Sequence, residues 1–324
     1  MRFIIFGAGA VGGTIGAELF DHGYDVLLIA RGAHYEAIKT QGLTFKTPNR
    51  TVTLRIPIVS HPEQIEFHRD DVVILTVKGQ QTLHALQDLL AAAGPDIPVV
   101  CCQNGVNNER EALRLFTHVY GMVVMLPGNH FEPGIVECNS ANKSGVLDAG
   151  CYPKGVDDII IKVTEALNQA NFSAVADAEI MRWKYQKLLG NLNNSLYAVC
   201  QPGGDIAAIS RLLREEAVQA ISAAGISLAG DEEVKRRYAD LIQMKPIDGK
   251  RRSGGSSWQS LVNGKGDIES DYLNGEIAMI GRMYGLTTPA NTVLQNLATK
   301  AARQNSKPGE YNAEEILKLI EERG

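Results

Sequence analysis

Three polar side chains that could take part in proton transfer share one face of a predicted helix in the second half of the chain. Lys187, Asn191 and Asn194 stand at i, i+4 and i+7 in a segment expected to be helical over 179–200. Asparagine is disfavoured inside helices and leucines make the adjacent faces apolar, so these side chains indicate buried hydrogen bonds or a ligand rather than a solvated face. The amine could donate a proton to a developing oxyanion, and the carboxamides could hold a polar substrate. Lys184, at i−3 on the same side, is the alternative acid.

A glycine-rich turn lies near the N-terminus between two apolar segments. The stretch Met1–Arg31 begins M-R-F-I-I-F-G-A-G-A-V-G-G and ends Y-D-V-L-L-I-A-R, which predicts a strand, a helix and a second strand. Gly7 would permit the tight turn, Gly9 would let a pyrophosphate approach the backbone, and Gly12 would let the helix pack closely on the strand. The alternative is a turn that only packs a helix onto a sheet. The candidate coenzyme-binding residues of this turn are Gly7, Ala8, Gly9, Ala10, Val11 and Gly12.

The residue at the end of the second strand favours a phosphorylated coenzyme. NAD-binding units usually place Asp or Glu there, to accept hydrogen bonds from the ribose 2′-hydroxyl. This chain has Arg31, whose guanidinium would pair with a 2′-phosphate, so we expect NADPH; a solvated surface arginine is the alternative. Lys78 follows the predicted strand Asp71–Val77, at an edge where ligands of open sheets gather, and is a further candidate for coenzyme binding; a solvated lysine is the alternative.

The elements that must position these residues suggest two domains. Apolar strands alternate with amphipathic helices in the first half, which predicts an α/β, Rossmann-like doubly wound sheet. A hairpin is expected from Leu43–Lys46 and Val52–Ile58, and shorter strands over 118–147 are expected to extend the sheet. We therefore expect a coenzyme-binding domain over 1–178 and an all-helical substrate domain over 179–324.

The helical half contains one segment that looks irregular. Met244–Gly266 holds P-I-D-G-K-R-R-S-G-G-S-S and is expected to form a long loop, either disordered or functional. Glu269 follows it and is expected in the first turn of a helix, where a carboxylate suits the helix dipole. The helices expected in this half cover 179–200, 205–224, 232–243, 267–284, 289–304 and 312–322.

Composition narrows the class of protein. The chain has 324 residues, a hydrophobic fraction of 44%, a charged fraction of 21% and a formal net charge of -5, as ordinary soluble proteins have. Without a basic block or a long apolar run, we expect neither nucleic acid nor a membrane as a partner. Five cysteines without a paired motif or a nearby histidine indicate no metal site and a reducing compartment. Because Met1 and Arg2 lead directly into a predicted strand, no signal peptide is expected, and we expect a cytoplasmic protein.

Taken in order, these motifs resemble those of the ketopantoate reductase family, the 2-dehydropantoate 2-reductases. The resemblance implies a Rossmann-like domain and a helical domain with the active site in the cleft between them. It also implies that NADPH reduces the ketone of a 2-oxo acid, preferentially 2-dehydropantoate, on the path to pantothenate and coenzyme A. It is carried by G-A-G-A-V-G at 7–12, Arg31, Lys78, Q-N-G at 103–105, the Lys187 helix, the Ser257-to-Glu269 spacing and T-T-P-A-N-T at 287–292.

The resemblance also implies roles for individual residues. Lys187 matches the family's general acid, and Glu269 matches the glutamate that holds the substrate hydroxyl. Asn104 matches an asparagine that lies between coenzyme and substrate. The residues that match the lining of the substrate pocket are Asn191, Asn194 and Ser257.

Several departures from the family pattern fall on the pocket. The chain has N-S-L-Y-A at 194–198 where N-P-L-T-A is common, and S-W-Q-S-L at 257–261 where S-M-x-Q-D is common, so Trp258 and Leu261 differ. The loop 245–256 is longer and more basic, and its Arg251 and Arg252 could close over an anion; solvated arginines are the alternative. The alternatives are a reductase of another 2-oxo or 3-oxo acid, and an NADPH-binding sensor without catalysis. In such a sensor, Lys187, Asn191 and Glu269 would have no function. The apolar helices leave a homodimer possible.

Overall fold

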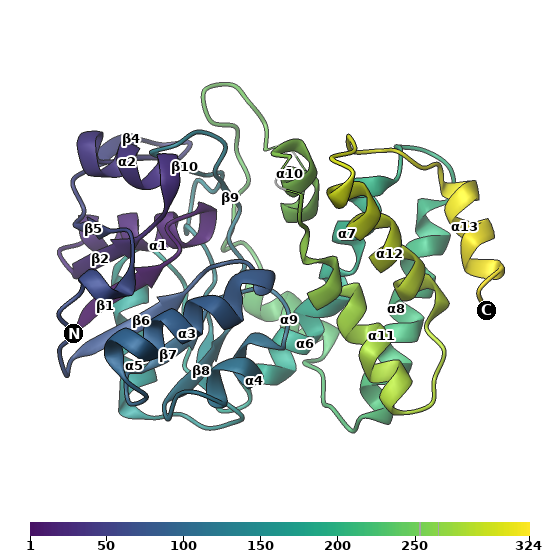
Figure 1. The fold of residues 1–324 in the computed structure, drawn as a ribbon, viewed down its shortest axis with the longest axis horizontal. Coiled ribbons are helices and arrows are strands. Elements are labelled where there is room, and N and C mark those ends of the chain that lie inside the picture. Colours follow the sequence, from purple (N-terminus) through teal and green to yellow (C-terminus); the bar gives the residue numbers. More distant parts are fainter. Residues whose placement is uncertain (253, 265) are drawn as a thin grey trace. The chain divides into compact units, whose positions relative to one another are not determined.

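The computed structural model describes residues 1–252, 254–264 and 266–324, which pack into two compact units (Figure 1). The first unit comprises 1–103, 108–181 and 231–252, and the second comprises 104–107, 182–230 and 253–324. The division expected near residue 178 stays a prediction. Packing assigns 231–252, which follows it in sequence, to the first unit.

A seven-stranded sheet forms the centre of the first unit. Its order is β11-β8-β7-β6-β1-β2-β5, and all neighbouring strands are parallel except β11 and β8. In chain order, the six parallel strands lie 3-2-1-4-5-6, which is the doubly wound Rossmann order, and the order reverses between β1 and β6. This arrangement confirms the expected fold class. The strands are β1 (Arg2–Phe6), β2 (Asp25–Ile29), β5 (Ile58–Val59), β6 (Asp71–Leu75), β7 (Val99–Cys101), β8 (Val119–Met122) and β11 (Ala149–Cys151).

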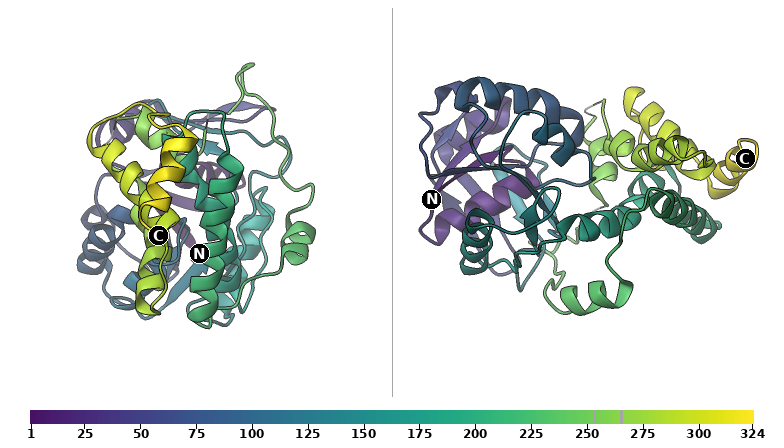
Figure 2. Two further views of the ribbon diagram at one scale, coloured as in Figure 1. Left: turned by 90° about the vertical axis from the view of Figure 1, so that its right-hand side faces the viewer. Right: turned by 90° about the horizontal axis from the view of Figure 1, so that it is seen from below.

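Helices cover both faces of this sheet because its strands are apolar on both sides. Phe3 and Ile5 of β1 pack with Ile15 of α1, whereas Ile4 packs in a separate cluster with Leu86 of α3. Each such side chain contributes about 1.5–3 kcal/mol when fully buried. The helices are α1 (Ala10–Asp21) and α5 (Asp158–Gln169) on one face, and α3 (Thr82–Ala93) and α4 (Asn108–Leu113) on the other (Figure 2).

A second sheet in the same unit corrects two expectations. Its order is β4-β3-β10-β9. It contains β9 and β10, which lie in the segment 118–147 that was expected to extend the main sheet. The segment Val52–Ile58 is not one strand, because Pro57 lacks an amide hydrogen and separates β4 from β5. The strands of the second sheet are β3 (Leu43–Lys46), β4 (Thr51–Leu54), β9 (Gly128–Asn129) and β10 (Ile135–Cys138). The remaining elements of the unit are α2 (Gly32–Gln41), η1 (Pro62–Gln64), η2 (Gly79–Gln81) and α9 (Asp231–Tyr238).

The described part of the second unit is built from helices packed through apolar stripes. In α8, for example, Ile209, Leu213, Ala217 and Ala220 are buried at helical spacing. The Asp205 side chain starts that helix by accepting a hydrogen bond from the Ala208 amide at 2.9 Å. The helices are α6 (Ile180–Asn191), α7 (Asn193–Val199), α8 (Ile206–Ala223), α10 (Ser256–Val262), η3 (Glu269–Tyr272), α11 (Asn274–Met283), α12 (Pro289–Arg303) and α13 (Ala313–Glu321).

Three expectations for the second half of the chain were wrong in part. The expected helix 179–200 is interrupted at Leu192, so Asn194 lies on α7 and not on the helix of Lys187. The segment Met244–Gly266 is not irregular throughout, because it contains α10. This helix begins after Gly255, whose backbone is extended, and its Leu261 is buried. The expected helix 267–284 is divided into η3 and α11 at Leu273, whose φ of -113° and ψ of -85° are not helical. Two positions of the expected loop, Ser253 and Lys265, lie outside the described residues. Across the described ranges, no helix is long and apolar enough to span a membrane.

Candidate active site

The glycine-rich turn of the first unit is shaped by close backbone packing. Gly7 has a φ of +111°, and a Cβ there would lie 2.9 Å from the Val77 amide nitrogen. A Cβ on Gly12 would lie 2.2 Å from the Gly7 carbonyl oxygen, so α1 can pack this closely only without a side chain at that position. The Thr76 hydroxyl donates to the same Gly7 carbonyl at 2.7 Å, which fastens the turn after β1 to the end of β6. The turn therefore lies where the strand order reverses.

The N-terminus of α1 has backbone amides that are not used within the helix. The first i→i−4 bond of the helix runs from the Gly13 amide to the Gly9 carbonyl at 2.7 Å. The amides of Ala10 and Val11 precede this bond and have no carbonyl partner within the helix. A Cβ on Gly9 would meet no described atom within 4 Å, so protein packing does not require a glycine there. A helix N-terminus next to a glycine with open space beside it is the arrangement expected for a pyrophosphate site.

Arg31 ends the connection from β2 and is the N-cap residue of α2. Its side chain is 53% exposed, and its Nη2 lies 2.8 Å from Asp88 Oδ2. The Nε2 atoms of His61 and His84 lie 3.4 and 3.8 Å from the same oxygen. An exposed ion pair of this kind contributes only about 0–1 kcal/mol, so the arginine can exchange Asp88 for a phosphate at small cost. Lys78 is half-buried at the N-cap of η2, beyond the end of β6.

Three of the predicted polar residues converge in the second unit. Lys187 Nζ donates a hydrogen bond to Asn104 Oδ1 at 2.7 Å, and Asn191 Nδ2 donates to the same oxygen at 3.3 Å. Lys187 and Asn191 thus lie on one face of α6, as their spacing predicted. Lys184, the alternative acid, is only 3% exposed.

The turn that carries Asn104 packs against the segment that carries Glu269. Gly105 has a φ of +79°, and a Cβ there would lie 3.0 Å from the Tyr272 carbonyl oxygen. Tyr272 ends η3, and Glu269 begins it with 8% of its surface exposed. The carboxylate of Glu269 is therefore mostly buried on an element that contacts the Asn104 turn.

Asn194 and Ser257 belong to two helices, α7 and α10, that approach each other at Gly255. A Cβ on Gly255 would lie 3.2 Å from Asn194 Oδ1. Ser257 is 1% exposed, and its Oγ has no hydrogen-bond partner among the described residues. A buried hydroxyl without a partner is uncommon in folded proteins, and an oxygen of a bound ligand would satisfy it. The closure of Arg251 and Arg252 over an anion stays a prediction.

A buried polar network that the sequence did not reveal supports the Lys187 helix. Asn274 Oδ1 accepts a hydrogen bond from Ser195 Oγ at 2.7 Å, and Asn274 Nδ2 donates to the Leu192 carbonyl at 3.2 Å. Leu192 separates α6 from α7, so the asparagine satisfies a carbonyl at the interruption of that helix. The network continues through Asn291 to the carboxylate of Glu216. Its signal in the sequence was a polar residue between apolar helix positions, as in L-N-G and P-A-N-T.

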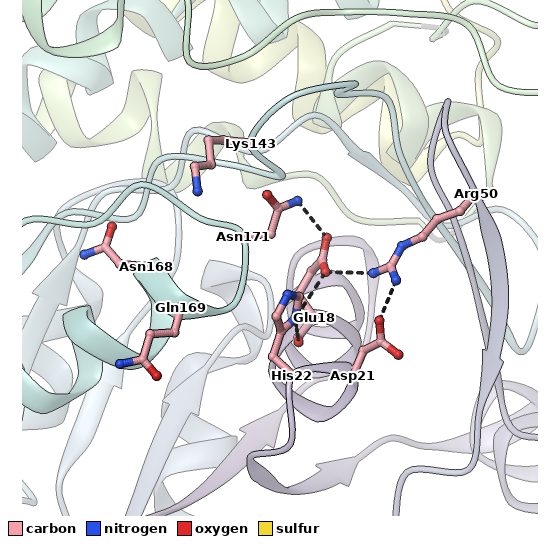
Figure 3. A pocket seen from close by; sticks show the side chains of 8 residues that line it. All are labelled: Glu18, Asp21, His22, Arg50, Lys143, Asn168, Gln169 and Asn171. Atoms are coloured by element: carbon pink, nitrogen blue, oxygen red, sulfur yellow. Dashed lines mark hydrogen bonds and ion pairs between the residues drawn. The ribbon is translucent and has the colours of Figure 1, made fainter.

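A polar pocket of about 300 Å³ lies elsewhere in the first unit (Figure 3). Glu18, 1% exposed, accepts hydrogen bonds from Arg50 Nη2 at 3.0 Å, from Asn171 Nδ2 at 3.3 Å and from Ser144 Oγ. These contacts pair the buried charge and tie α1 to distant segments. The part of the chain that the structure describes holds no group of three acidic, cysteine or histidine side chains fit for a metal ion.

Comparison with known proteins places the chain in a family. The family model described as Ketopantoate reductase PanE/ApbA matches residues 3–154, and its C-terminal counterpart matches 179–302. The 2-dehydropantoate 2-reductase of Pyrococcus horikoshii is 28% identical over 304 residues, which cover 91% of this chain and 95% of that protein. The enzyme of the same name from Archaeoglobus fulgidus is 29% identical over 306 residues, which cover 91% and 96%.

Solved structures share the fold over nearly the whole chain. A PanE/ApbA family ketopantoate reductase from Ralstonia eutropha has a TM-score of 0.79 and 27% identity, with 94% of this chain and 99% of that one covered. D-Mandelate dehydrogenase, solved with NADH and anilino(oxo)acetate, has a TM-score of 0.80 and 24% identity over the same shares. The chain therefore belongs to the ketopantoate reductase family of oxidoreductases, which reduce a ketone with a nicotinamide coenzyme.

Proposed function

We propose that this protein is a 2-dehydropantoate 2-reductase that uses NADPH to reduce the ketone of its substrate to the alcohol of pantoate. The observation that carries the proposal is the cluster in which Lys187 and Asn191 share Asn104 Oδ1 as acceptor. Family membership supports the reaction class, and the relatives reported above carry the name of this activity.

The first unit would bind the coenzyme through its glycine-rich turn. The amides of Ala10 and Val11 would donate to the pyrophosphate, and Arg31 would leave Asp88 to pair with the 2′-phosphate. Lys78, at the carboxyl end of β6, would add a positive charge near the phosphates. The bound NADPH supplies a hydride to the carbonyl carbon of the substrate.

Lys187 would supply the proton that completes the reduction. As the hydride adds to the carbonyl carbon, the π electrons move to oxygen, and the ammonium stabilises that charge and then transfers a proton to it. Asn104 would hold the amine in position before the reaction, since its Oδ1 already accepts a hydrogen bond from Nζ at 2.7 Å. The products are then the alcohol, the oxidised coenzyme and a neutral lysine that takes up a proton from solvent.

The remaining polar residues would hold the substrate. Asn191, Asn194 and the Ser257 hydroxyl would donate hydrogen bonds to the carboxylate and hydroxyl oxygens without adding a competing charge. Glu269 would accept a hydrogen bond from the substrate hydroxyl. Ser257 Oγ is buried without a partner among the described residues, so a substrate oxygen there would satisfy it.

The direct test is turnover by the purified full-length chain. We expect oxidation of NADPH, followed by its absorbance, when 2-dehydropantoate is added, and much slower oxidation of NADH at matched concentration. Absence of turnover with 2-dehydropantoate and with a panel of 2-oxo and 3-oxo acids would refute the enzyme assignment. Tight NADPH binding in that case would favour the sensor alternative.

A different oxo acid substrate is the second candidate, because of two side chains of α10. A Cβ on Gly254 would lie 2.5 Å from the Trp258 ring, so the indole packs directly on this backbone, and Leu261 is 6% exposed. These apolar groups on the helix that carries Ser257 would suit a larger or less polar substrate. A higher kcat/KM for a branched or aromatic 2-oxo acid than for 2-dehydropantoate would establish this candidate.

A homodimer stays a prediction, and sedimentation of the purified chain tests it.

A further inference from the structure

The imidazole of His34 joins the glycine-rich turn to a second loop of the first unit. Its Nε2 lies 2.7 Å from the Ala8 carbonyl oxygen. The Gly134 amide donates a hydrogen bond to its Nδ1 at 2.9 Å. The two ring nitrogens therefore link Ala8 to Gly134, which is 126 positions later in the chain and directly precedes β10.

The two partners define the protonation of this ring. A backbone amide can only donate, so Nδ1 is the unprotonated acceptor. A carbonyl can only accept, so Nε2 carries the proton and donates it to Ala8. These two contacts fit the tautomer of His34 that carries its proton on Nε2.

The Ala8 carbonyl belongs to the peptide group that leads into the phosphate-binding end of α1. The other end of that peptide group, the Gly9 amide, donates to the Gly7 carbonyl at 2.8 Å. The Ala8 amide itself donates to the Ile29 carbonyl at 3.2 Å, and Ala8 is 1% exposed. Three hydrogen bonds therefore hold this stretch of backbone, and the bond from His34 is the one among them that a side chain makes.

His34 also belongs to the helix whose N-cap is Arg31. It lies in the first turn of α2, and α2 packs on Gly134, where a Cβ would lie 3.0 Å from the Ala37 Cβ. A tilted contact with the ring of His130, at 4.1 Å between centroids, adds to this packing. One side chain therefore connects the turn expected to bind the pyrophosphate with the helix that carries the cation for the 2′-phosphate.

We propose that His34 is a positioning residue for the coenzyme: it holds the Gly7–Gly9 turn in the form that binds the pyrophosphate. This inference rests on the proposed use of a nicotinamide dinucleotide. Because the pyrophosphate is common to both coenzymes, loss of the Ala8 bond weakens NADPH and NADH equally. Loss of Arg31 weakens NADPH alone.

Isosteric variants separate the two hydrogen bonds. The amide nitrogen of His34→Gln can replace Nε2 and donate to Ala8, whereas the amide oxygen of His34→Asn can replace Nδ1 and accept from Gly134. We expect His34→Ala and His34→Asn to raise the Kd of both coenzymes about tenfold in a fluorescence titration. His34→Gln should stay within about threefold of the wild type. The kcat at saturating coenzyme and the KM for the oxo acid should change less than about twofold in all three.

The control is His118→Ala, at an exposed histidine whose backbone carbonyl accepts the Val99 amide. It should bind both coenzymes as the wild type does. Thermal unfolding of each variant shows whether it is folded. If His34→Ala does not fold, the comparison of His34→Gln with His34→Asn still tests the inference. An unchanged Kd in His34→Asn, or equal loss in the Gln and Asn variants, would overturn the inference. Failure of the wild type to bind either coenzyme would refute the proposed function and, with it, this inference. Binding without turnover would refute only the proposed reaction.

Discussion

Lys187 Nζ donates a 2.7 Å hydrogen bond to Asn104 Oδ1, and the two residues are 83 positions apart in the chain. The acceptor is a neutral amide oxygen, which binds an ammonium less strongly than a carboxylate would. This contact orients the lysine amine, and in the proposed reaction a substrate oxygen would replace it. Asn191 donates to the same oxygen at 3.3 Å and holds the Asn104 amide in this orientation.

Lys187→Met should reduce kcat by about 10²–10⁴, the usual contribution of a general acid, because the developing oxyanion loses both its cation and its proton donor. The Kd for NADPH should stay within about twofold of the wild type, since the glycine-rich turn and Arg31, which are proposed to bind the coenzyme phosphates, belong to the first unit. Single-turnover kinetics and a fluorescence titration measure the two quantities. Lys184→Met is the matched control, one turn earlier on the same helix. An active Lys187→Met beside an inactive Lys184→Met would show that the acid is Lys184.

Arg31→Ala should raise the KM for NADPH by about 10–100-fold, which is the loss expected for charge-assisted hydrogen bonds to a phosphate. The KM for NADH should hardly change, because that coenzyme has a hydroxyl in place of the phosphate. Initial rates over a range of each coenzyme give the comparison. Equal changes for both coenzymes would show that Arg31 does not contact the 2′-phosphate.

Asp88→Asn tests the same site from the other side of the ion pair. The Asp88 carboxylate holds Arg31 at 2.8 Å and would also repel a phosphate that approaches the arginine. Removing its charge should lower the KM for NADPH by up to several-fold, because an exposed ion pair contributes about 0–1 kcal/mol. The KM for NADH should stay unchanged. An increase in the KM for NADPH would mean instead that Asp88 orients Arg31 for binding.

Local patterns explain which parts of the site could be predicted from the sequence. The spacing of Lys187 and Asn191 determines that they share a helix face, and both in fact bond one oxygen. The turn at Gly7 also follows from local sterics, since its φ is +111°. The roles of these residues in binding and catalysis stay predictions, because hydrogen bonds alone do not identify a ligand.

The parts that could not be predicted depend on contacts between distant segments. The assignment of 231–252 to the first unit depends on pairing such as the Arg237–Asp148 ion pair at 2.5 Å, which no local pattern encodes. The helix at Ser256–Val262 forms in a Gly/Ser-rich stretch because tertiary packing buries Leu261, which overrides weak propensity. The His34 bridge spans 26 and 100 positions to its two partners.

Asn274→Ala should lower the free energy of unfolding by about 2–4 kcal/mol, because it leaves the buried Ser195 hydroxyl and the Leu192 carbonyl without their partner. Urea denaturation measures the change. Because Leu192 connects α6 to α7, kcat should also fall. Ser270→Ala is the control: it removes one buried hydroxyl contact, at 2.9 Å from Thr299 Oγ1, and should cost only about 1 kcal/mol. Equal losses in the two variants would argue against a special role for the network.

The stability of the protein should decline at alkaline pH because of its buried thiols. Burial raises the pKa of Cys138 from 9.0 to about 12 and that of Cys151 to about 11. Above pH 9 the unfolded chain releases these protons first, so unfolding is favoured as pH rises toward 11–12, whereas below pH 9 the full stability is retained. For Cys138 alone the slope is at most about 1.4 kcal/mol per pH unit.

Urea denaturation of wild type and Cys138→Ala at a series of pH values from neutral to alkaline tests this sign. The variant should lose less stability than the wild type as the solution becomes alkaline, whatever the cost of the substitution near neutral pH. Native Cys138 should also react slowly with a thiol reagent at mildly alkaline pH, because little thiolate is present and the side chain is buried, and quickly once urea unfolds the chain. Parallel stability curves for the two proteins, together with rapid reaction of the native thiol, would contradict the raised pKa.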